Sequence, residues 1–192
     1  MKAKITAILI AALISVGSLG AQNRWALKTN LLHDATLSAN LALEWGFAQH
    51  WSAELSGSVN WWQPGDMSIK HVLVQPEVRY WTCDRFNGLF FDVHAIGGYT
   101  PCFGGFWDFS KYYSKFPNLK TFSLQNAIIL GGGIGLGYDI ILSRHWNLEL
   151  ELGLGYMYIK GDEYSDGVLI LKDSKFDYIG PTRLGITISY LF

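Results

Sequence analysis

Strict alternation of apolar and polar residues is the feature that most constrains what this chain can fold into. In the clearest segment, 51–61, every odd position is apolar or Gly, and every even position is Ser, Glu or Asn. Seven other segments alternate in the same way, the last four more weakly: 40–47, 146–158, 183–192, 24–33, 71–81, 89–99 and 127–141. A period of two residues is typical of a β-strand whose two faces meet different surroundings. The sequence therefore predicts eight strands.

The predicted connections alternate in length. Short turns fall near residues 48–50, 82–88 and 143–145. Longer links cover 62–70, 100–120 and 160–177, and only the link Asp34–Ser38 departs from this pattern by being short. Short turns on one side and long loops on the other are typical of up-and-down outer-membrane barrels, whose two termini lie on the periplasmic side.

The composition supports a barrel within a membrane. Charged residues make up 16% of the chain, against about 25% in soluble domains. No segment after residue 21 offers the 18 or more consecutive apolar residues that indicate a spanning helix. A closed barrel is the other way to satisfy every backbone polar group in lipid. The net charge of −1 argues against a nucleic-acid partner, which would require a basic face.

A soluble, lipocalin-like carrier is the alternative, since it would turn the apolar face inward. Three features favour the membrane barrel. Aromatic residues sit near the ends of the apolar faces, as in interfacial girdles: Trp45, Trp51, Trp61, Tyr80, Tyr99, Tyr138, Trp146, Tyr156, Tyr158 and Tyr190. Glycines alternate along 131–137, which suits a narrow lumen. Tyr190 and Phe192 resemble the C-terminal insertion signal that the outer-membrane barrel-assembly machinery reads.

The N-terminal segment predicts export. Lys2 and Lys4 precede an apolar stretch, Ile5–Val16, and small residues follow it. This is the pattern of a secretory signal peptide. We therefore expect a signal peptide over 1–21 and one outer-membrane barrel over 22–192.

The two cysteines predict free thiols at opposite ends of the barrel. Cys83 falls in a predicted turn and Cys102 in a predicted loop, with the strand Leu89–Tyr99 between them. A strand of this length spans roughly 30 Å, whereas a disulfide needs Cα atoms about 4.4–6.8 Å apart.

The polar face of such a barrel would form a charged interior. The residues that we expect there, in an ionic lattice that stabilises the lumen, are Lys28, Glu44, Glu54, Glu77, Arg79, Asp92, Asp139, Glu149, Glu151 and Arg183. Eight strands leave room only for side chains, so no open pore is expected. Buried charges must pair or change their protonation. The sequence indicates no cofactor or metal site.

The predicted loop Thr100–Lys120 is the best indication of function. Its aromatic residues are Phe103, Phe106, Trp107, Phe109, Tyr112, Tyr113 and Phe116. Exposed aromatics at this density favour contact with a protein, a glycan or the membrane interface. A loop that packs on itself as a lid is the alternative.

One pattern suggests catalysis. His50 and Ser52, with Glu54 two positions later, superficially resemble the His/Ser pair of lipid A deacylases. A serine nucleophile requires a base within hydrogen-bonding reach. However, a similar segment recurs at Arg144–Leu150 with Asn147 in the serine position, which favours a structural role at the barrel rim.

Four segments carry a resemblance to a known family: Trp25–Leu32 with Asp34, Ala35, Thr36 and Asn40; Leu73–Trp81; Arg85–Gly88; and Tyr178–Gly185. With them the chain resembles a family of small Bacteroidota outer-membrane β-barrels that is known only as a domain of unknown function. The resemblance implies fold and location and supplies no catalytic residues. Members look like accessory surface barrels, some of which accompany fimbrial or other envelope assemblies.

The sequence thus predicts an all-β, eight-stranded antiparallel transmembrane barrel in the outer membrane, in contact with its lipid. We expect a non-enzymatic accessory, docking or envelope-stabilising role. The alternative is a lipid A or phospholipid-modifying enzyme.

Overall fold

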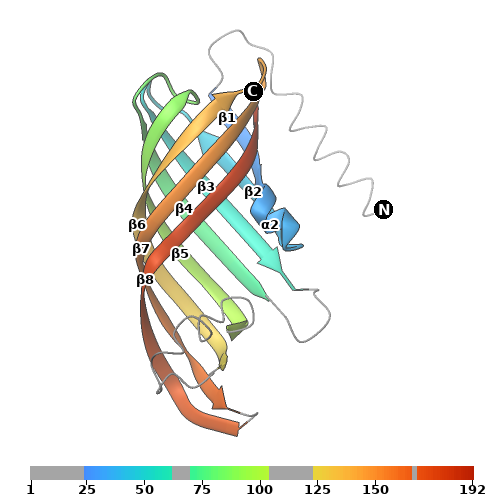
Figure 1. Ribbon diagram of the computed structural model, residues 1–192, viewed down its shortest axis with the longest axis vertical. Coiled ribbons are helices and arrows are strands. Elements are labelled where there is room, and N and C mark those ends of the chain that lie inside the picture. Colours follow the sequence, from blue (N-terminus) through green and yellow to red (C-terminus); the bar gives the residue numbers. More distant parts are fainter. Residues whose placement is uncertain (1–23, 62–69, 104–122, 166–167) are drawn as a thin grey trace, which may run out of the picture.

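The chain forms one closed sheet of eight antiparallel strands (Figure 1). The computed structural model describes residues 24–61, 70–103, 123–165 and 168–192. The strands are β1 (Trp25–Asn30), β2 (Ala39–Trp45), β3 (Trp51–Asn60), β4 (His71–Trp81), β5 (Gly88–Phe103), β6 (Ser123–Ile141), β7 (Trp146–Ser165) and β8 (Val168–Leu191). Each strand pairs with the next, and β1 pairs with β8 to close the barrel. The all-β, eight-stranded antiparallel prediction is confirmed.

The alternation in the sequence sends polar residues into the barrel and apolar residues outward. On β7, Glu149 and Glu151 are 1% and 5% exposed, whereas Leu150 and Leu152 between and beside them are 44% and 45% exposed. Successive side chains of a strand point to opposite faces. The apolar face of each strand therefore forms the outer surface of the barrel, and the polar face lines its interior.

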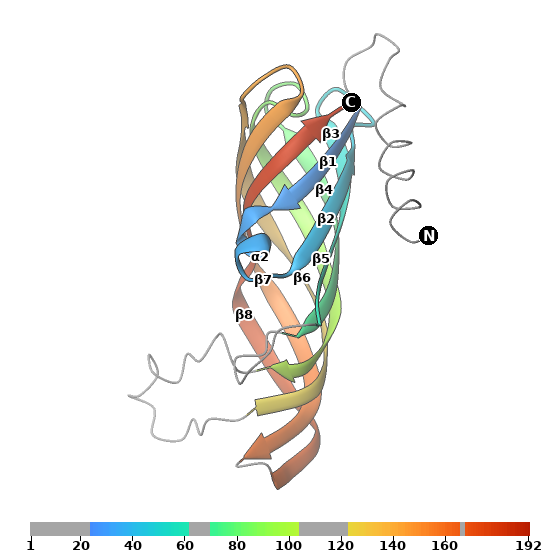
Figure 2. The ribbon, with the colours of Figure 1, turned by 90° about the vertical axis from the view of Figure 1, so that its right-hand side faces the viewer.

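One end of the barrel, the turn end, carries the three tight connections at 46–50, 82–87 and 142–145. The short turns predicted there are confirmed. Trp25 and Phe192 exchange backbone hydrogen bonds of 3.0 and 3.3 Å, so the first and last described strands begin and end at this same end. The opposite end is the loop end. Figure 2 shows the two ends and the seam between β1 and β8.

The strand predicted over 24–33 is too long, because β1 ends at Asn30 and a short helix, α2 (Leu31–Ala35), follows. The Asn30 side chain accepts a hydrogen bond from the Leu32 amide at 3.0 Å. This is the bond that an N-cap residue makes to start a helix. A helix of five residues is too short for the helical repeat of apolar residues to be recognised in the sequence.

The long link predicted over 160–177 is wrong, because β7 continues to Ser165 and β8 begins at Val168. The resulting hairpin projects beyond the other strands at the loop end (Figure 1). Lys160 and Asp173 pair across it at 2.9 Å, and their hydrogen bond raises the pKa of Lys160 and lowers that of Asp173. In this hairpin, charged residues interrupt the alternation of apolar and polar residues in the sequence, although β7 and β8 still pair through their backbones.

The loop predicted over 100–120 begins later than expected, since β5 extends to Phe103. Cys102 therefore belongs to β5 and not to a loop, and its side chain lies outside the described part of the structure. Cys83 is a free, exposed thiol at the turn end, as predicted.

Two apolar clusters lie inside the barrel, one toward each end. The turn-end plug consists of Ala26, Trp81, Phe86, Phe90 and Leu191, all 6% exposed or less. The second cluster, toward the loop end, consists of Ala127, Ile129 and Ile159. The polar lumen lies between them.

In the described part of the chain, no helix combines the length and apolar character that a membrane span would need.

Candidate functional site

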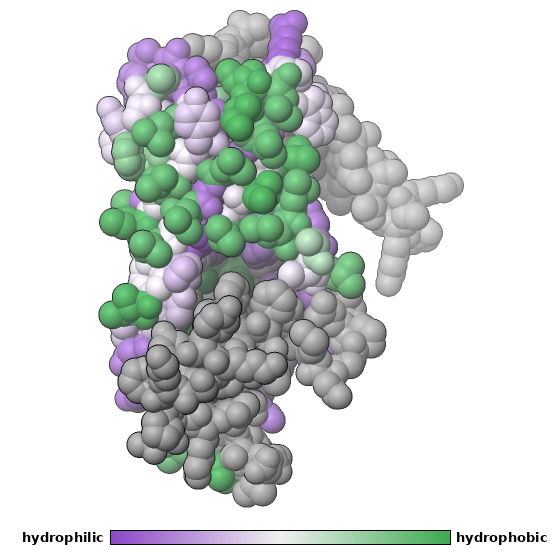
Figure 3. All heavy atoms as spheres, in the orientation of Figure 1, coloured by the Kyte–Doolittle hydropathy of each residue, from purple (hydrophilic) through white to green (hydrophobic). Residues whose placement is uncertain are grey.

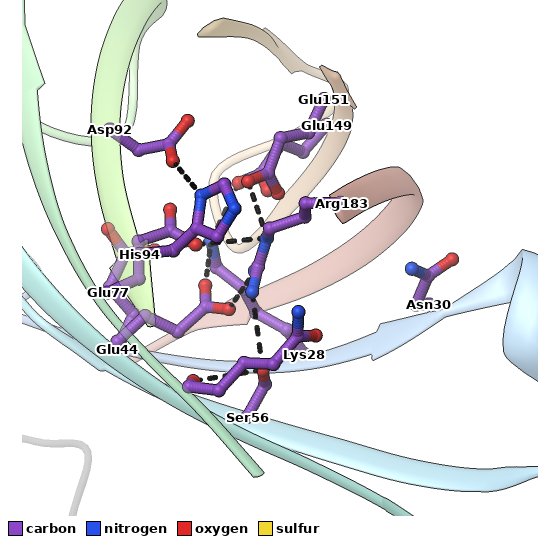
Figure 4. A network of polar contacts seen from close by, with 12 residues as sticks. Lys28, Asn30, Glu44, Ser56, Glu77, Asp92, His94, Glu149, Glu151 and Arg183 are labelled. Carbon is purple, nitrogen blue, oxygen red and sulfur yellow. Dashed lines mark hydrogen bonds and ion pairs between the residues drawn. The ribbon is translucent and has the colours of Figure 1, made fainter. Parts of the chain in front are cut away.

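The ten charged residues singled out in the sequence all point into the barrel between the two clusters. Nine of them are 5% exposed or less, and the side chain of Arg183 is 10% exposed. All eight strands contribute at least one of them: Lys28 (β1), Glu44 (β2), Glu54 (β3), Glu77 and Arg79 (β4), Asp92 (β5), Asp139 (β6), Glu149 and Glu151 (β7) and Arg183 (β8). We call this set the ionic lattice. Figure 4 labels part of it, namely Lys28, Glu44, Glu77, Asp92, Glu149, Glu151 and Arg183.

Strand register places like charges side by side in the lattice. Glu54 on β3 is directly opposite Glu44 on β2 and Glu77 on β4. Like charges directly opposite one another destabilise a sheet. The row of three carboxylates can therefore be stable only if cations reach it from elsewhere in the lumen.

Arg79 is the main cation of the lattice. It is fully buried, and its guanidinium stacks on the ring of Phe90 at 4.5 Å. It forms ion pairs with five glutamates: Glu77, Glu149 (2.7 Å), Glu54 (3.0 Å), Glu44 (3.2 Å) and Glu151 (3.2 Å). Arg79 thus joins carboxylates from three different strands besides its own.

Lys28 and Arg183 extend the lattice toward its two ends. Lys28 Nζ lies 2.6 Å from Glu149 and 3.1 Å from Glu54, and it also pairs with Glu44. Arg183 lies 2.5 Å from Glu54 and Glu151 and 2.9 Å from Glu77. Eight of the ten expected residues are therefore joined by ion pairs across the lumen.

His94 links the lattice to a threonine that the sequence did not indicate. Its Nδ1 lies 2.7 Å from Asp92 Oδ1, and its Nε2 lies 2.8 Å from Thr182 Oγ1. The ring fits because a Cβ at Gly133 would stand 2.8 Å from both His94 Nε2 and Thr182 Oγ1. Thr182 was missed because β8 shifts its register at this point, so simple alternation does not place it.

Negative charge exceeds positive charge in the lattice. Seven buried carboxylates (Glu44, Glu54, Glu77, Asp92, Asp139, Glu149 and Glu151) share the lumen with three permanent cations, Lys28, Arg79 and Arg183. Ionised carboxylates are costly to bury without a partner. Protons or additional cations must therefore reside in this part of the barrel.

Three of the carboxylates lie close enough together to share a metal ion. Glu77, Asp92 and Glu151 each offer an oxygen atom within 4.8 Å of the other two. They come from three strands, so no local spacing in the sequence could have revealed them.

The structure does not bring His50 and Ser52 together. His50 Nδ1 contacts the Cys83 carbonyl oxygen at 2.6 Å. The fully buried Ser52 hydroxyl donates to Glu44 and accepts a hydrogen bond from Trp81 Nε1 at 2.8 Å. Ser52 therefore connects the plug to the lattice, and among the described residues it has no histidine partner.

The structure describes the aromatic residues expected at the C-terminal end of the last strand but not those of the expected partner-contact loop. Tyr190 packs edge-on against Trp146 with ring centroids 5.1 Å apart, and Phe192 stacks on Tyr190 at 6.5 Å. The aromatic residues expected to contact a partner, 106–116, lie outside the described residues, as does the Phe103 side chain. The expected signal peptide, 1–21, also lies outside them.

A family model described as a protein of unknown function, DUF3575, matches residues 5–192. This match confirms the resemblance to a domain of unknown function. No curated protein matches the chain.

Proposed function

The chain belongs to the DUF3575 family, and we propose that it is a non-enzymatic outer-membrane β-barrel that serves a surface assembly as a docking or envelope-stabilising component. The observation that carries this proposal is the distribution of side chains on the closed sheet: apolar on the outside and ionic within. A transmembrane barrel has an apolar outer band, aromatic girdles and a polar interior.

The outer face supports placement in lipid. Hydrophobic residues cover the middle of the face in Figure 3, and hydrophilic residues gather at the turn end. At that end aromatic rings from neighbouring strands contact each other: Trp25 with Trp45 at 5.9 Å, and Trp51 with Tyr80 at 5.1 Å. Toward the loop end, Trp61 stacks on Tyr99 at 6.5 Å. Amphipathic rings favour the level of lipid headgroups.

The interior supports a role other than transport. The turn-end plug and the ionic lattice place buried side chains from all eight strands inside the barrel, and eight strands leave room for little more than side chains. A barrel of this kind can anchor a structure in the membrane without conducting solutes. On this proposal the turn end, which carries both termini of the sheet, faces the periplasm.

Docking is assigned to the connection between β5 and β6. Residues 104–122 join two strands at the loop end, which would face outward. Their sequence combines Phe106, Trp107, Phe109, Tyr112, Tyr113 and Phe116 with only four charged residues. Aromatic residues of this kind dominate the binding energy of protein interfaces.

Co-purification tests this assignment. The tagged protein is cross-linked in cells and isolated from gently solubilised outer membranes, with residues 106–116 either intact or replaced by a Gly-Ser linker. We expect a stoichiometric partner that is lost with this replacement. Replacement of residues 63–69, which belong to another loop-end connection, is the control and should retain the partner. A barrel that is recovered alone from the intact protein would contradict the docking role.

The alternative, a lipid-modifying enzyme, is less well supported. The chain of contacts from Asp92 through His94 to Thr182 has the order of groups that activates a hydroxyl nucleophile. However, Thr182 is 8% exposed and Ser52 is fully buried. Neither hydroxyl is placed to meet an acyl chain, so the structural role is favoured.

A further inference from the structure

A pocket of about 230 Å³ opens at the turn end of the barrel. The three tight connections of that end each contribute to its lining, and so do two residues of the turn-end plug, Phe86 and Leu191. Most small-molecule sites enclose about 300–1,000 Å³. A pocket of this size therefore suits one or two amino-acid residues of a ligand.

Asn147 is the lining residue that points to a ligand. It belongs to β7, lines the pocket and is 0% exposed. Its Nδ2 donates to the Phe86 carbonyl oxygen at 2.9 Å, which fixes the orientation of the amide. Its Oδ1 has no hydrogen-bond partner among the described residues. A buried acceptor without a donor is costly, so an N–H group that enters the pocket would stabilise it.

The charge of the pocket favours an anion. Arg85 and Arg144 line it, and Asp84 is the one acid among the described lining residues. Asp84 already accepts a hydrogen bond from Gln49 at 2.9 Å. Burial, and next the positive charge of Arg24, lower the pKa of Arg85. A guanidinium binds a carboxylate through two parallel N–H bonds, and a bound carboxylate would also relieve the crowding of positive charge around Arg85.

We propose that this pocket binds the C-terminal residue of an extended protein tail whose last side chain is apolar. Such a residue presents a carboxylate, an amide N–H and a side chain together. The carboxylate matches Arg85 and Arg144, and the amide N–H matches Oδ1 of Asn147. The side chain matches the apolar residues of the lining, which are Phe86, Ile141 and Leu191. Capture of a C-terminal carboxylate is a recurring mode of peptide recognition.

Only the source of the tail rests on the proposed function. The turn end is the end that we assign to the periplasm, so a periplasmic protein would supply the tail. Binding itself does not require the membrane, because the lining residues lie at the turn end of the folded barrel. A barrel that binds no tail would leave the outer-membrane proposal intact, and a barrel that proves soluble would still bind a terminal carboxylate.

Three labelled peptides test the pocket on the full-length barrel, purified in a non-ionic detergent, by fluorescence anisotropy. The first is Gly-Ser-Gly-Leu with a free C-terminus. The second ends in a carboxamide and lacks the carboxylate. In the third, an ester oxygen replaces the last amide N–H. We expect the free acid to bind and the other two to bind at least roughly tenfold more weakly, because each loses one matched hydrogen-bonding group. Equal binding of the three peptides, or binding of none, would overturn the proposal.

Paired variants locate the binding. Arg85→Gln combined with Arg144→Gln should weaken binding of the free acid at least roughly tenfold and leave the already weak carboxamide unchanged. Lys172→Gln is the matched control, since Lys172 is an exposed cation of β8 at the loop end, and it should change neither affinity. The ester peptide probes the Asn147 acceptor without altering the buried residue. Unchanged binding of the free acid to the double variant would refute the assignment of the pocket.

Discussion

Replacement of Arg79 by methionine is expected to destabilise the barrel by about 3–5 kcal/mol, the cost of breaking a buried ion pair by removing one partner. Methionine has a similar length and can still pack on Phe90. However, five glutamates lose their shared cation: Glu44, Glu54, Glu77, Glu149 and Glu151. Three of them are direct neighbours across the sheet, so their repulsion would no longer be offset.

Urea unfolding in detergent or lipid, followed by tryptophan fluorescence, measures this loss. Arg144→Met is the control, because Arg144 lies exposed in the turn between β6 and β7. Exposed substitutions of this kind usually change stability by less than about 0.5 kcal/mol. If the two variants unfold at the same urea concentration, the ionic lattice does not stabilise the barrel.

An arginine at the middle of the outer face is expected to have the second-largest effect. Ile134 on β6 is 68% exposed and lies between Val93 and Leu154 of the neighbouring strands. At the midplane of a bilayer, an outward arginine costs roughly 2–4 kcal/mol, and near the interface the cost falls to roughly 0–1 kcal/mol. Ile134→Arg should therefore lower the free energy of unfolding in lipid vesicles by that larger amount.

Ile140→Arg is the matched control, since it lies on the same face of β6 close to the turn end and is 38% exposed. Unfolding of both variants in vesicles should show the larger loss for Ile134→Arg. In a soluble barrel both positions would face water, and the two variants would have nearly equal stability. Equal values would therefore contradict the membrane placement.

The strands could be predicted where one face is apolar and the other is polar. Predicted and observed bounds agree at 71–81 and differ by one residue for β3. The prediction failed beyond residue 160, because Lys160, Asp162 and Asp173 interrupt the apolar face of a hairpin that backbone pairing still holds. Alternation of apolar and polar residues arises because the two faces of a strand meet different surroundings, and it does not depend on backbone hydrogen bonding. The alternation therefore ends where both faces of a strand meet the same surroundings, even though the strand continues.

The inward residues could be predicted from parity along each strand, but their partners could not. The sequence placed Asp92 in the lumen, and His94 lies two residues further along the same face of β5. The approach of Thr182 to His94 depends on a shift in register between β7 and β8. Proximity of Glu77, Asp92 and Glu151 depends on how three strands align around the barrel, and one strand's pattern does not contain that information.

Extraction of native membranes tests the central claim most directly. Outer membranes from cells that express the tagged chain are washed with alkaline carbonate and floated through a density gradient, and the protein is examined by electrophoresis with and without boiling. The account predicts that the protein floats with the membranes and migrates differently after boiling, as a closed barrel that unfolds only on heating. Release into the carbonate wash would show a peripheral or soluble protein and contradict the account.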